Sequence, residues 1–220
     1  MRKAIAALMI VAFIFITAAN VEAQPSVGVK TGDWVEYHVK TTGAVPGAQD
    51  LTWAKIEVVD VEGEAFHANF TVRYVNGTVQ SSNRFFNFSV GNVQAWIIIP
   101  ANLSPGQTFY DSSINSNVPI QGQIEKTVAG ATRTVTWTNS TLGGVQRNKE
   151  WDKATGFYIQ SADNLGNYTV NAQAIATNIW SPQILGLNQN TFYLIVAAII
   201  VIIVVIAIIV VISQRKMKRK

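Results

Sequence analysis

The chain has 220 residues, a formal net charge of +4 and no cysteine. The lack of cysteine excludes thiol catalysis, cysteine-based zinc sites and disulfide cross-links. The positive charge does not indicate nucleic-acid binding, because residues 24–190 hold ten basic and twelve acidic side chains and the surplus of Lys and Arg lies at the two ends.

The first 23 residues have the layout of a secretory signal peptide. Arg2 and Lys3 precede a long apolar run, and Val21-Glu22-Ala23 places small residues at the −3 and −1 positions of a cleavage site. We therefore expect the mature chain to begin at Gln24. The alternatives are an uncleaved N-terminal anchor and a pilin-type signal cut after Ala4.

Residues 24–180 are dominated by a period of two, which is typical of half-buried strands. Apolar and polar residues alternate clearly over residues 33–40, 52–61 and 64–75. Asn76-Gly77 follows and predicts a hairpin with a type I′ turn. The continuous apolar run Val93–Pro100 predicts a central strand.

A second hairpin is predicted over residues 150–162, where Asp152 opens the turn and Gly156 takes a left-handed conformation. With about nine or ten strands and short turns, antiparallel pairing is favoured. The sequence thus predicts an all-β, mostly antiparallel domain, either a sandwich or an open half-barrel, with one C-terminal transmembrane helix.

The C-terminal part has the composition of a membrane anchor. Residues 181–191 form a juxtamembrane linker, and Phe192–Ile212 is an uncharged stretch of 21 residues, 15 of which are Ile or Val. At about 1.5 Å per residue this stretch spans about 31 Å, which matches the apolar core of a bilayer. The tail 213–220 carries five Lys or Arg residues and predicts a cytoplasmic end, with the ectodomain outside the cell membrane.

Six N-x-[ST] tripeptides occur in the predicted ectodomain. Such a tripeptide is a candidate glycosylation acceptor when it lies on the exported side of a membrane. The acceptor residues are Asn69, Asn76, Asn87, Asn102, Asn139 and Asn167. Asn87 lies in the aromatic stretch FFNFSV, so it is the acceptor with the greatest chance of being buried.

Motifs for catalysis or metal binding are not evident. His38 and His67 lie on predicted polar strand faces without a nucleophile motif beside them, and Asp60, Glu62 and Glu64 form too few oxygen ligands for a calcium loop. We expect no enzymatic activity, no cofactor and no metal site.

Tryptophan is frequent for a chain of this length. Aromatic rings of this kind either pack within and across strands or stack on sugar rings, and packing is the simpler explanation. The six residues are Trp34, Trp53, Trp96, Trp137, Trp151 and Trp180. Trp180, which closely precedes the span, is also placed to rest at the lipid interface.

The order of these segments resembles a group of uncharacterised archaeal single-pass surface proteins. The resemblance rests on Gly32-Asp33-Trp34, which opens the β-domain, and on Asp152 with Thr155-Gly156-Phe157 in the late hairpin. The β-rich part is also remotely similar to the half-barrel of lipoprotein-carrier domains. That resemblance implies an apolar concavity that holds acyl chains.

The expected function is that of a membrane-anchored cell-surface glycoprotein with a structural, adhesive or partner-docking role. The expected partners are membrane lipid, contacted by the span, and an envelope protein; nucleic acid is excluded. The alternative is a module that binds lipid or glycan on a concave apolar sheet. A cavity lined by Phe66, Phe70, Phe86 and Trp96 would favour binding, whereas a filled core with an exposed edge strand would favour docking.

Overall fold

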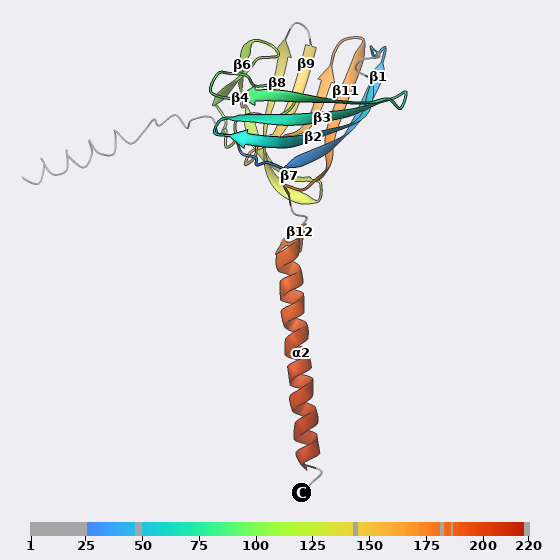
Figure 1. Cartoon of the computed structure of the whole chain (residues 1–220), viewed down its shortest axis with the longest axis vertical. Helices are drawn as coiled ribbons and strands as arrows, with labels where there is room; N and C mark the ends of the chain where they lie inside the picture. The colour runs from blue at the N-terminus through green and yellow to red at the C-terminus, as the bar shows by residue number, and fades with distance from the viewer. Residues whose placement is uncertain (1–25, 47–49, 143–144, 181–182, 186, 218–220) are drawn as a thin grey trace, which may run out of the picture.

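A computed structural model describes residues 26–46, 50–142, 145–180, 183–185 and 187–217. The predicted signal peptide therefore lies outside the described residues, as does the Gly143-Gly144 turn. The described chain is a β-domain followed by one long helix (Figure 1).

Nine strands form one continuous antiparallel sheet in the order β4-β3-β2-β1-β11-β10-β9-β8-β7. Two further strands, β5 and β6, form a separate hairpin between the two halves of the chain. The strands are β1 (Trp34–Gly43), β2 (Leu51–Glu62), β3 (Ala65–Tyr74), β4 (Val79–Asn87), β5 (Thr108–Asp111), β6 (Ser116–Pro119), β7 (Gly122–Val128), β8 (Ala131–Leu142), β9 (Val145–Asp152), β10 (Tyr158–Asn164) and β11 (Tyr168–Thr177). The predicted all-β, mostly antiparallel class is confirmed.

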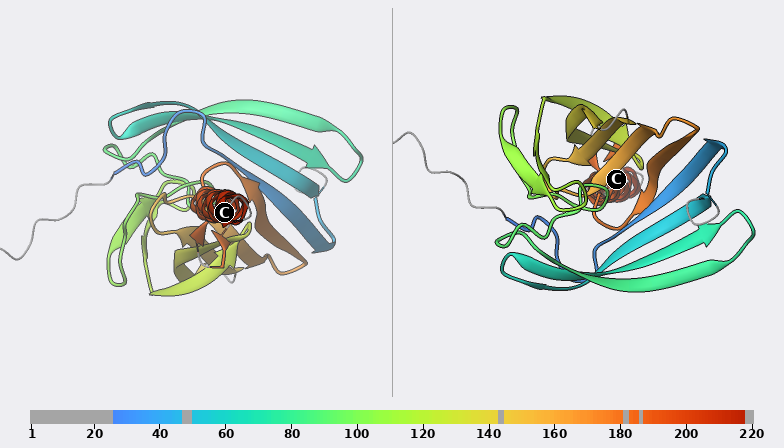
Figure 2. Two further views of the ribbon diagram at one scale, coloured as in Figure 1. Left: turned by 90° about the horizontal axis from the view of Figure 1, so that it is seen from below. Right: turned by 90° about the horizontal axis from the view of Figure 1, so that it is seen from above.

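The sheet consists of two meanders that meet where β1 pairs with β11. Val35 lies opposite Thr177 and Gly43 lies opposite Tyr168 in this pair. Seen along the axis of the helix, β1–β4 form one layer and β7–β11 form a second layer that faces it (Figure 2). The sheet is continuous, so the sides of the two layers that point toward each other belong to one face of the sheet. We call this face the concave face.

Period-two alternation accounts for which side chains line this face. Val35, Tyr37 and Val39 of β1 are all buried, whereas His38 and Lys40 between and beyond them are exposed. Successive side chains of a strand point to opposite faces of its sheet, so one face of β1 enters the core and the other meets water.

The apolar run Val93–Pro100 is not the central strand that the sequence predicts. Residues Val93–Ala101, here called the central segment, run through turns and isolated bridges between the two layers. Ile97, Ile98 and Ile99 are 0–1% exposed. A segment surrounded by two sheet layers is buried on all sides, so an apolar run of this length does not require strand pairing.

The Asn76-Gly77 hairpin forms between β3 and β4, but its turn is of another type. Only Gly77 has a positive φ, of 84°, and its N–H donates to the carbonyl of Tyr74 at 3.0 Å. A type I turn closed by a left-handed glycine fits this pattern, whereas type I′ requires positive φ at both central residues.

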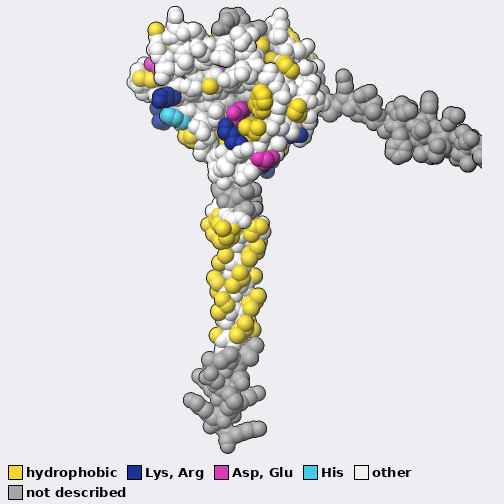
Figure 3. All heavy atoms as spheres, turned by 180° about the vertical axis from the view of Figure 1, so that it is seen from behind, with side chains coloured by type: hydrophobic (Ala, Val, Ile, Leu, Met, Phe, Trp, Pro, Cys, Tyr) yellow, Lys and Arg dark blue, Asp and Glu magenta, His cyan; other side chains and the backbone are white. Residues whose placement is uncertain are grey.

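The helix α2 (Gln189–Met217) follows the short hairpin strands β12 (Gln183–Ile184) and β13 (Leu187–Asn188). It begins earlier and ends later than the predicted span. Its stretch Gln189–Ile208 is long and apolar enough to cross a membrane. Figure 3 shows apolar side chains around this stretch, while the backbone and side chains that are neither apolar nor charged make up most of the visible surface of the β-domain.

Candidate functional site

Five of the six predicted acceptor asparagines are exposed. Asn87, at the end of β4, is half-buried, and its Oδ1 accepts a hydrogen bond from the Ser89 N–H at 2.9 Å. The exposed five are Asn69 on β3, Asn76 in the β3–β4 turn, Asn102 after the central segment, Asn139 on β8 and Asn167 before β11. A glycosyltransferase needs an accessible acceptor, and these positions meet that requirement; the modification itself stays a prediction.

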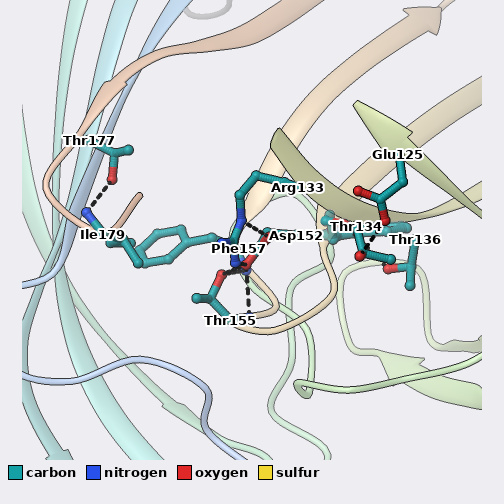
Figure 4. Close-up of polar contacts among 10 residues, drawn as sticks. Glu125, Arg133, Thr134, Thr136, Asp152, Thr155, Phe157, Thr177 and Ile179 are labelled. Atoms are coloured by element: carbon teal, nitrogen blue, oxygen red, sulfur yellow. Dashed lines mark hydrogen bonds and ion pairs between the residues drawn. The ribbon is translucent and has the colours of Figure 1, made fainter. Parts of the chain in front are cut away.

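A fully buried carboxylate organises the turn between β9 and β10. Asp152 is 0% exposed, and its two oxygens accept hydrogen bonds from the Arg133 guanidinium at 2.7 and 3.1 Å. Its Oδ2 also accepts from the backbone N–H and the hydroxyl of Thr155, at 3.0 and 2.7 Å. Figure 4 shows Arg133 and Thr155 converging on this carboxylate. Paired arginine donors and further hydrogen bonds compensate a buried charge.

The same turn fixes the central segment. Gly156 has a φ of +74°, as the sequence predicts, and its carbonyl accepts a hydrogen bond from the Ile99 N–H at 3.0 Å. On the neighbouring strand β9, the fully buried Trp151 donates from its indole N–H to the Ala95 carbonyl at 2.7 Å. The carboxylate cluster and these two bonds hold the central segment against β9 and β10.

The sequence suggested that Trp180 rests at the lipid interface, but the structure buries this residue inside the β-domain. Its side chain is 2% exposed at the base of the β-domain, 5.9 Å below the Arg133 guanidinium. Nearby, the Asn178 side chain accepts from the Trp34 N–H and donates to the Gly32 carbonyl, both at 2.8 Å. The end of the β-domain that precedes α2 is thus firmly attached to the sheet.

The histidines and the acidic turn do not form a reactive centre. His67 lies on β3 with its Nδ1 2.8 Å from Asp60 Oδ1, and His38 lies apart on the exposed face of β1. Glu62 and Glu64 flank the β2–β3 turn. Among the residues that the structure describes, no group of three His, Asp or Glu side chains could hold a metal ion.

The aromatic residues proposed to line a cavity instead pack on one another. Phe66 and Phe86 are 1% and 0% exposed with ring centroids 5.0 Å apart, and the Phe70 ring lies 6.1 Å from Phe86. Trp96 differs, because its ring lies 5.5 Å from Phe70 and remains 38% exposed. Three rings therefore fill the interior, and the fourth marks a place where the interior meets solvent.

Ionisable side chains lie on the concave face of β9 and β10. Lys149 is only 6% exposed, and burial lowers its pKa although Asp163 and Asp111 act against this shift. Burial raises the pKa of Asp163, while Lys149 and Arg147 act in the opposite direction. The charged form of a buried side chain is unfavourable unless groups of opposite charge lie near it.

Two buried tyrosines lie next to this group. Burial raises the pKa of both hydroxyls, in Tyr37 and in Tyr158. Tyr37 donates its hydroxyl proton to the Tyr158 carbonyl at 2.8 Å, which links β1 to β10 across the interior. These hydroxyls stay neutral and act as hydrogen-bonding groups.

Sequence reasoning missed Arg133 and Lys149. The signal for Lys149 was present, because strict alternation along β9 puts Arg147 and Lys149 on the same face as Trp151. Arg133 carried no such signal, since its pairing with Asp152 depends on how β8 aligns with β9.

Comparison with known proteins identifies no family. No family model and no curated protein matches the chain. Among solved structures, the amine-binding protein of Rhodnius prolixus in its tryptamine complex aligns with a TM-score of 0.27 and 13% identity, over 68% of this chain and 64% of that one. The chain thus spans less than two thirds of that protein's length, and so low a likeness carries no argument about fold or ligand.

The class that the structure defines is an antiparallel β-domain carried on a C-terminal helix long and apolar enough to span a membrane. The similarities to archaeal surface proteins and to lipoprotein-carrier domains remain expectations.

Proposed function

We propose that the protein is a single-pass cell-surface glycoprotein without enzymatic activity. Residues 1–23 direct export and are removed, the β-domain lies outside the cell, α2 crosses the membrane, and the basic tail remains in the cytoplasm. This orientation is supported by the apolar surface of α2, the Lys and Arg residues of the segment 213–220 and the exposed N-x-[ST] tripeptides.

Its proposed role is structural or adhesive, through docking of a partner protein of the cell envelope. The observation that carries this role is that the chain's own central segment occupies the interior nearest the helix, while an edge strand stays open. Among the strands that the structure describes, β4 pairs with β3 alone; its last residue, Asn87, forms an isolated bridge to Asn92, and its residues 79–85 are all exposed. An open edge offers unpaired N–H and C=O groups to which another strand can add.

The composition of β4 supports this role. Val79 and Phe85 are 53% and 48% exposed, and Arg84 is the only charged residue of the strand. Proteins that avoid edge pairing usually place several charges, a proline or a bulge on such a strand. β4 has no proline and pairs with β3 without a register shift.

Photo-crosslinking in intact cells tests the docking role. A photoreactive amino acid replaces Val79 on β4, or Ile175 on β11 as the control. The two residues are 53% and 50% exposed, but β11 is paired on both sides. We expect a discrete crosslinked protein from position 79 and none from position 175. Equal products from both positions, or none from either, would contradict docking at this edge.

The orientation is tested separately with a protease added to intact cells. We expect the β-domain to be degraded and an epitope tag after Lys220 to be protected. A tag that is digested while the β-domain persists would reverse the proposed topology.

The alternative function, binding of lipid or glycan on the concave face, is favoured by one specific observation. Trp96 projects a 38% exposed ring beside Phe70. Part of the concave face is therefore open to solvent.

A further inference from the structure

The outer face of the sheet, opposite the concave face, carries a row of aligned polar side chains. Trp137 on β8 pairs with Glu150 on β9, and Glu150 pairs in turn with Gln160 on β10. Trp151, the next residue of β9, points into the interior and donates to the central segment. Because side chains alternate along a strand and paired residues share a face, Trp137, Glu150 and Gln160 all lie on the outer face.

Two pockets meet along this row and form one shallow groove. They have volumes of about 290 and about 220 Å³, and Gln160 and Ala162 of β10 line both of them. The short side chain of Ala162 leaves the hollow between its larger neighbours. Further outer-face side chains that line the groove are Trp137, Asn139, Asn148, Glu150, Asn171 and Gln173. The groove therefore runs from β8 across β9 and β10 to β11.

Trp137 presents a flat ring at the β8 end of this groove. Its partner on β7 is Gly122, and a Cβ at Gly122 would meet the indole atoms Cε2, Cζ2 and Nε1, each at 2.6 Å. Three ring atoms at one distance show that the indole lies flat over the glycine. The opposite ring face consequently points away from the sheet, and the side chain is only half-buried. An aromatic face of this kind is a surface on which a sugar ring can stack.

The polar groups of the groove are held in place and keep bonding capacity. Lys126 Nζ donates to Glu150 Oε2 at 2.6 Å and to Gln160 Oε1 at 3.0 Å, which compensates the carboxylate and leaves the Gln160 amide nitrogen to donate. Asn139 bonds to Gln121 through its backbone, and in the described part of the chain its side-chain amide has no partner. Compensated charge with free donors and acceptors suits a neutral, polyhydroxylated ligand.

One of the predicted glycosylation acceptors lies on the wall of the groove. Asn139 opens the tripeptide Asn139-Ser140-Thr141 and is exposed. The pairing of β7 with β8 ends at Gly122 and Trp137, so Asn139 lies just past the edge strand, where a transferase can reach it. Trp137 and Asn139 are two residues apart on one strand, which places them on the same face with Cα atoms about 7 Å apart.

The surroundings of other acceptors differ from those of Asn139. Asn102 also lines a pocket, of about 300 Å³, but none of the described residues that line it is aromatic. The side chain of Asn69 accepts a hydrogen bond from Asn83 Nδ2 at 2.8 Å on the neighbouring strand. Asn139 combines an accessible amide, an aromatic ring on the same face and a groove that begins beside it.

We propose that the outer groove binds the sugar chain attached to Asn139. The first sugar ring lies against Trp137, and the following rings continue over Ala162 with hydrogen bonds to Asn148 and Gln160. Covalent attachment keeps the sugar at a high local concentration, so weak stacking and hydrogen bonds suffice to hold it.

This inference rests on the proposed glycoprotein function and deepens it, because it assigns one glycan a binding site on the chain that carries it. A glycan held in this way shields the outer face of β8, β9 and β10. The docking strand β4 lies at the other edge of the sheet from β7 and stays uncovered.

Hydroxyl-radical footprinting of the full chain from its native cells, in detergent, tests the site. The wild type is compared with Asn139→Gln and Thr141→Ala, which each remove the acceptor tripeptide by a different change. Mass spectrometry measures the oxidation of each tryptophan, and we expect severalfold less oxidation of Trp137 in the wild type than in both variants. Trp53, half-buried on the outer face of β2, is the reference and should be oxidised equally in all three proteins.

A thermal double-mutant cycle provides a second measurement. Asn139→Gln should lower the melting temperature by about 2–4 °C when Trp137 is present, the shift expected from one aromatic stacking contact in a domain of this size. In the Trp137→Ala background the same change should have no effect. Protein from a host that attaches no N-linked sugar should show no such difference between the backgrounds. Footprinting needs no change at Trp137, so the inference stays testable if Trp137→Ala does not fold.

Glycopeptide mass spectrometry separates the failure of this inference from failure of the glycoprotein proposal. Sugar on Asn139 with unchanged oxidation of Trp137 would show that the groove does not hold it. Sugar on other acceptors but not on Asn139 would also overturn the inference, and in both cases the glycoprotein proposal would stand. Absence of sugar from every acceptor would refute both.

Discussion

Replacing Gly156 by alanine should strongly destabilise the β-domain, because two costs coincide at this residue. Its φ of +74° is left-handed, which costs an alanine about 1–2 kcal/mol. The added Cβ would also overlap the carbonyl oxygen of Ile99, a backbone atom that cannot rotate away. Relief of this overlap moves the central segment and breaks the bond from the Ile99 N–H to the Gly156 carbonyl.

The second cost can be separated with a matched control. Gly77 has a similar φ of +84°, but a Cβ there meets no atom within 4 Å. Overpacking and a lost buried hydrogen bond cost about 1–3 kcal/mol each. We therefore expect Gly156→Ala to be about 2–6 kcal/mol less stable than Gly77→Ala.

Thermal unfolding of the full chain in detergent, followed by tryptophan fluorescence, measures the difference. For a domain of this size about 1 kcal/mol corresponds to about 2–4 °C, so Gly156→Ala should unfold about 4–24 °C below Gly77→Ala. The fully buried Trp151, bonded to the Ala95 carbonyl, reports directly on loss of the central segment. Equal melting temperatures for the two variants would refute the docking of this segment on the β9–β10 turn.

Further measurements test the buried charges and the glycosylation of the acceptor asparagines. Asp152→Asn should lower stability by about 2–4 kcal/mol in denaturant unfolding, because it breaks a buried ion pair and leaves Arg133 without its anion; a loss below about 1 kcal/mol would contradict this. Lys149→Met should instead raise stability by about 1 kcal/mol at pH 7, since burial destabilises the lysine cation more than Asp163 and Asp111 stabilise it. The folded-state pKa of Lys149 is lowered, so the unfolded chain binds more protons just below pH 10.5; wild-type stability then rises with pH, and the advantage of the variant should shrink. A constant advantage up to pH 10.5 would contradict the shift. Glycopeptide mass spectrometry of native protein should find sugar at most of the exposed acceptors and least at Asn87, and a mature N-terminus at Gln24; an unmodified Asn69 and Asn76 would refute the glycoprotein assignment.

The class of the fold was accessible from sequence because alternation is local. A strand with one buried face repeats its pattern every two residues, and Val35, Tyr37 and Val39 show this without reference to any other segment. The candidate span was equally accessible, since length and composition alone decide whether a helix can cross a bilayer.

The central segment was predicted wrongly because burial alone does not determine conformation. Ile97, Ile98 and Ile99 are buried as their apolarity suggests. Whether such a run becomes a strand or a filling between layers depends on how the sheet bends at the β1–β11 seam. The paired strands β1 and β11 lie far apart in the sequence, so no short stretch of sequence contains the information that sets this bend.

The candidate sites divide in the same way. Sequence alone determined the apolar span, the acceptor tripeptides and the left-handed glycine of the late turn, because each depends on a few neighbouring residues. The tertiary structure decided that Arg133 meets Asp152, and that Asp163 and Asp111 lie close enough to Lys149 to act on its pKa. Register between strands and the distance between layers fix these contacts, and both arise from packing summed over the whole sheet.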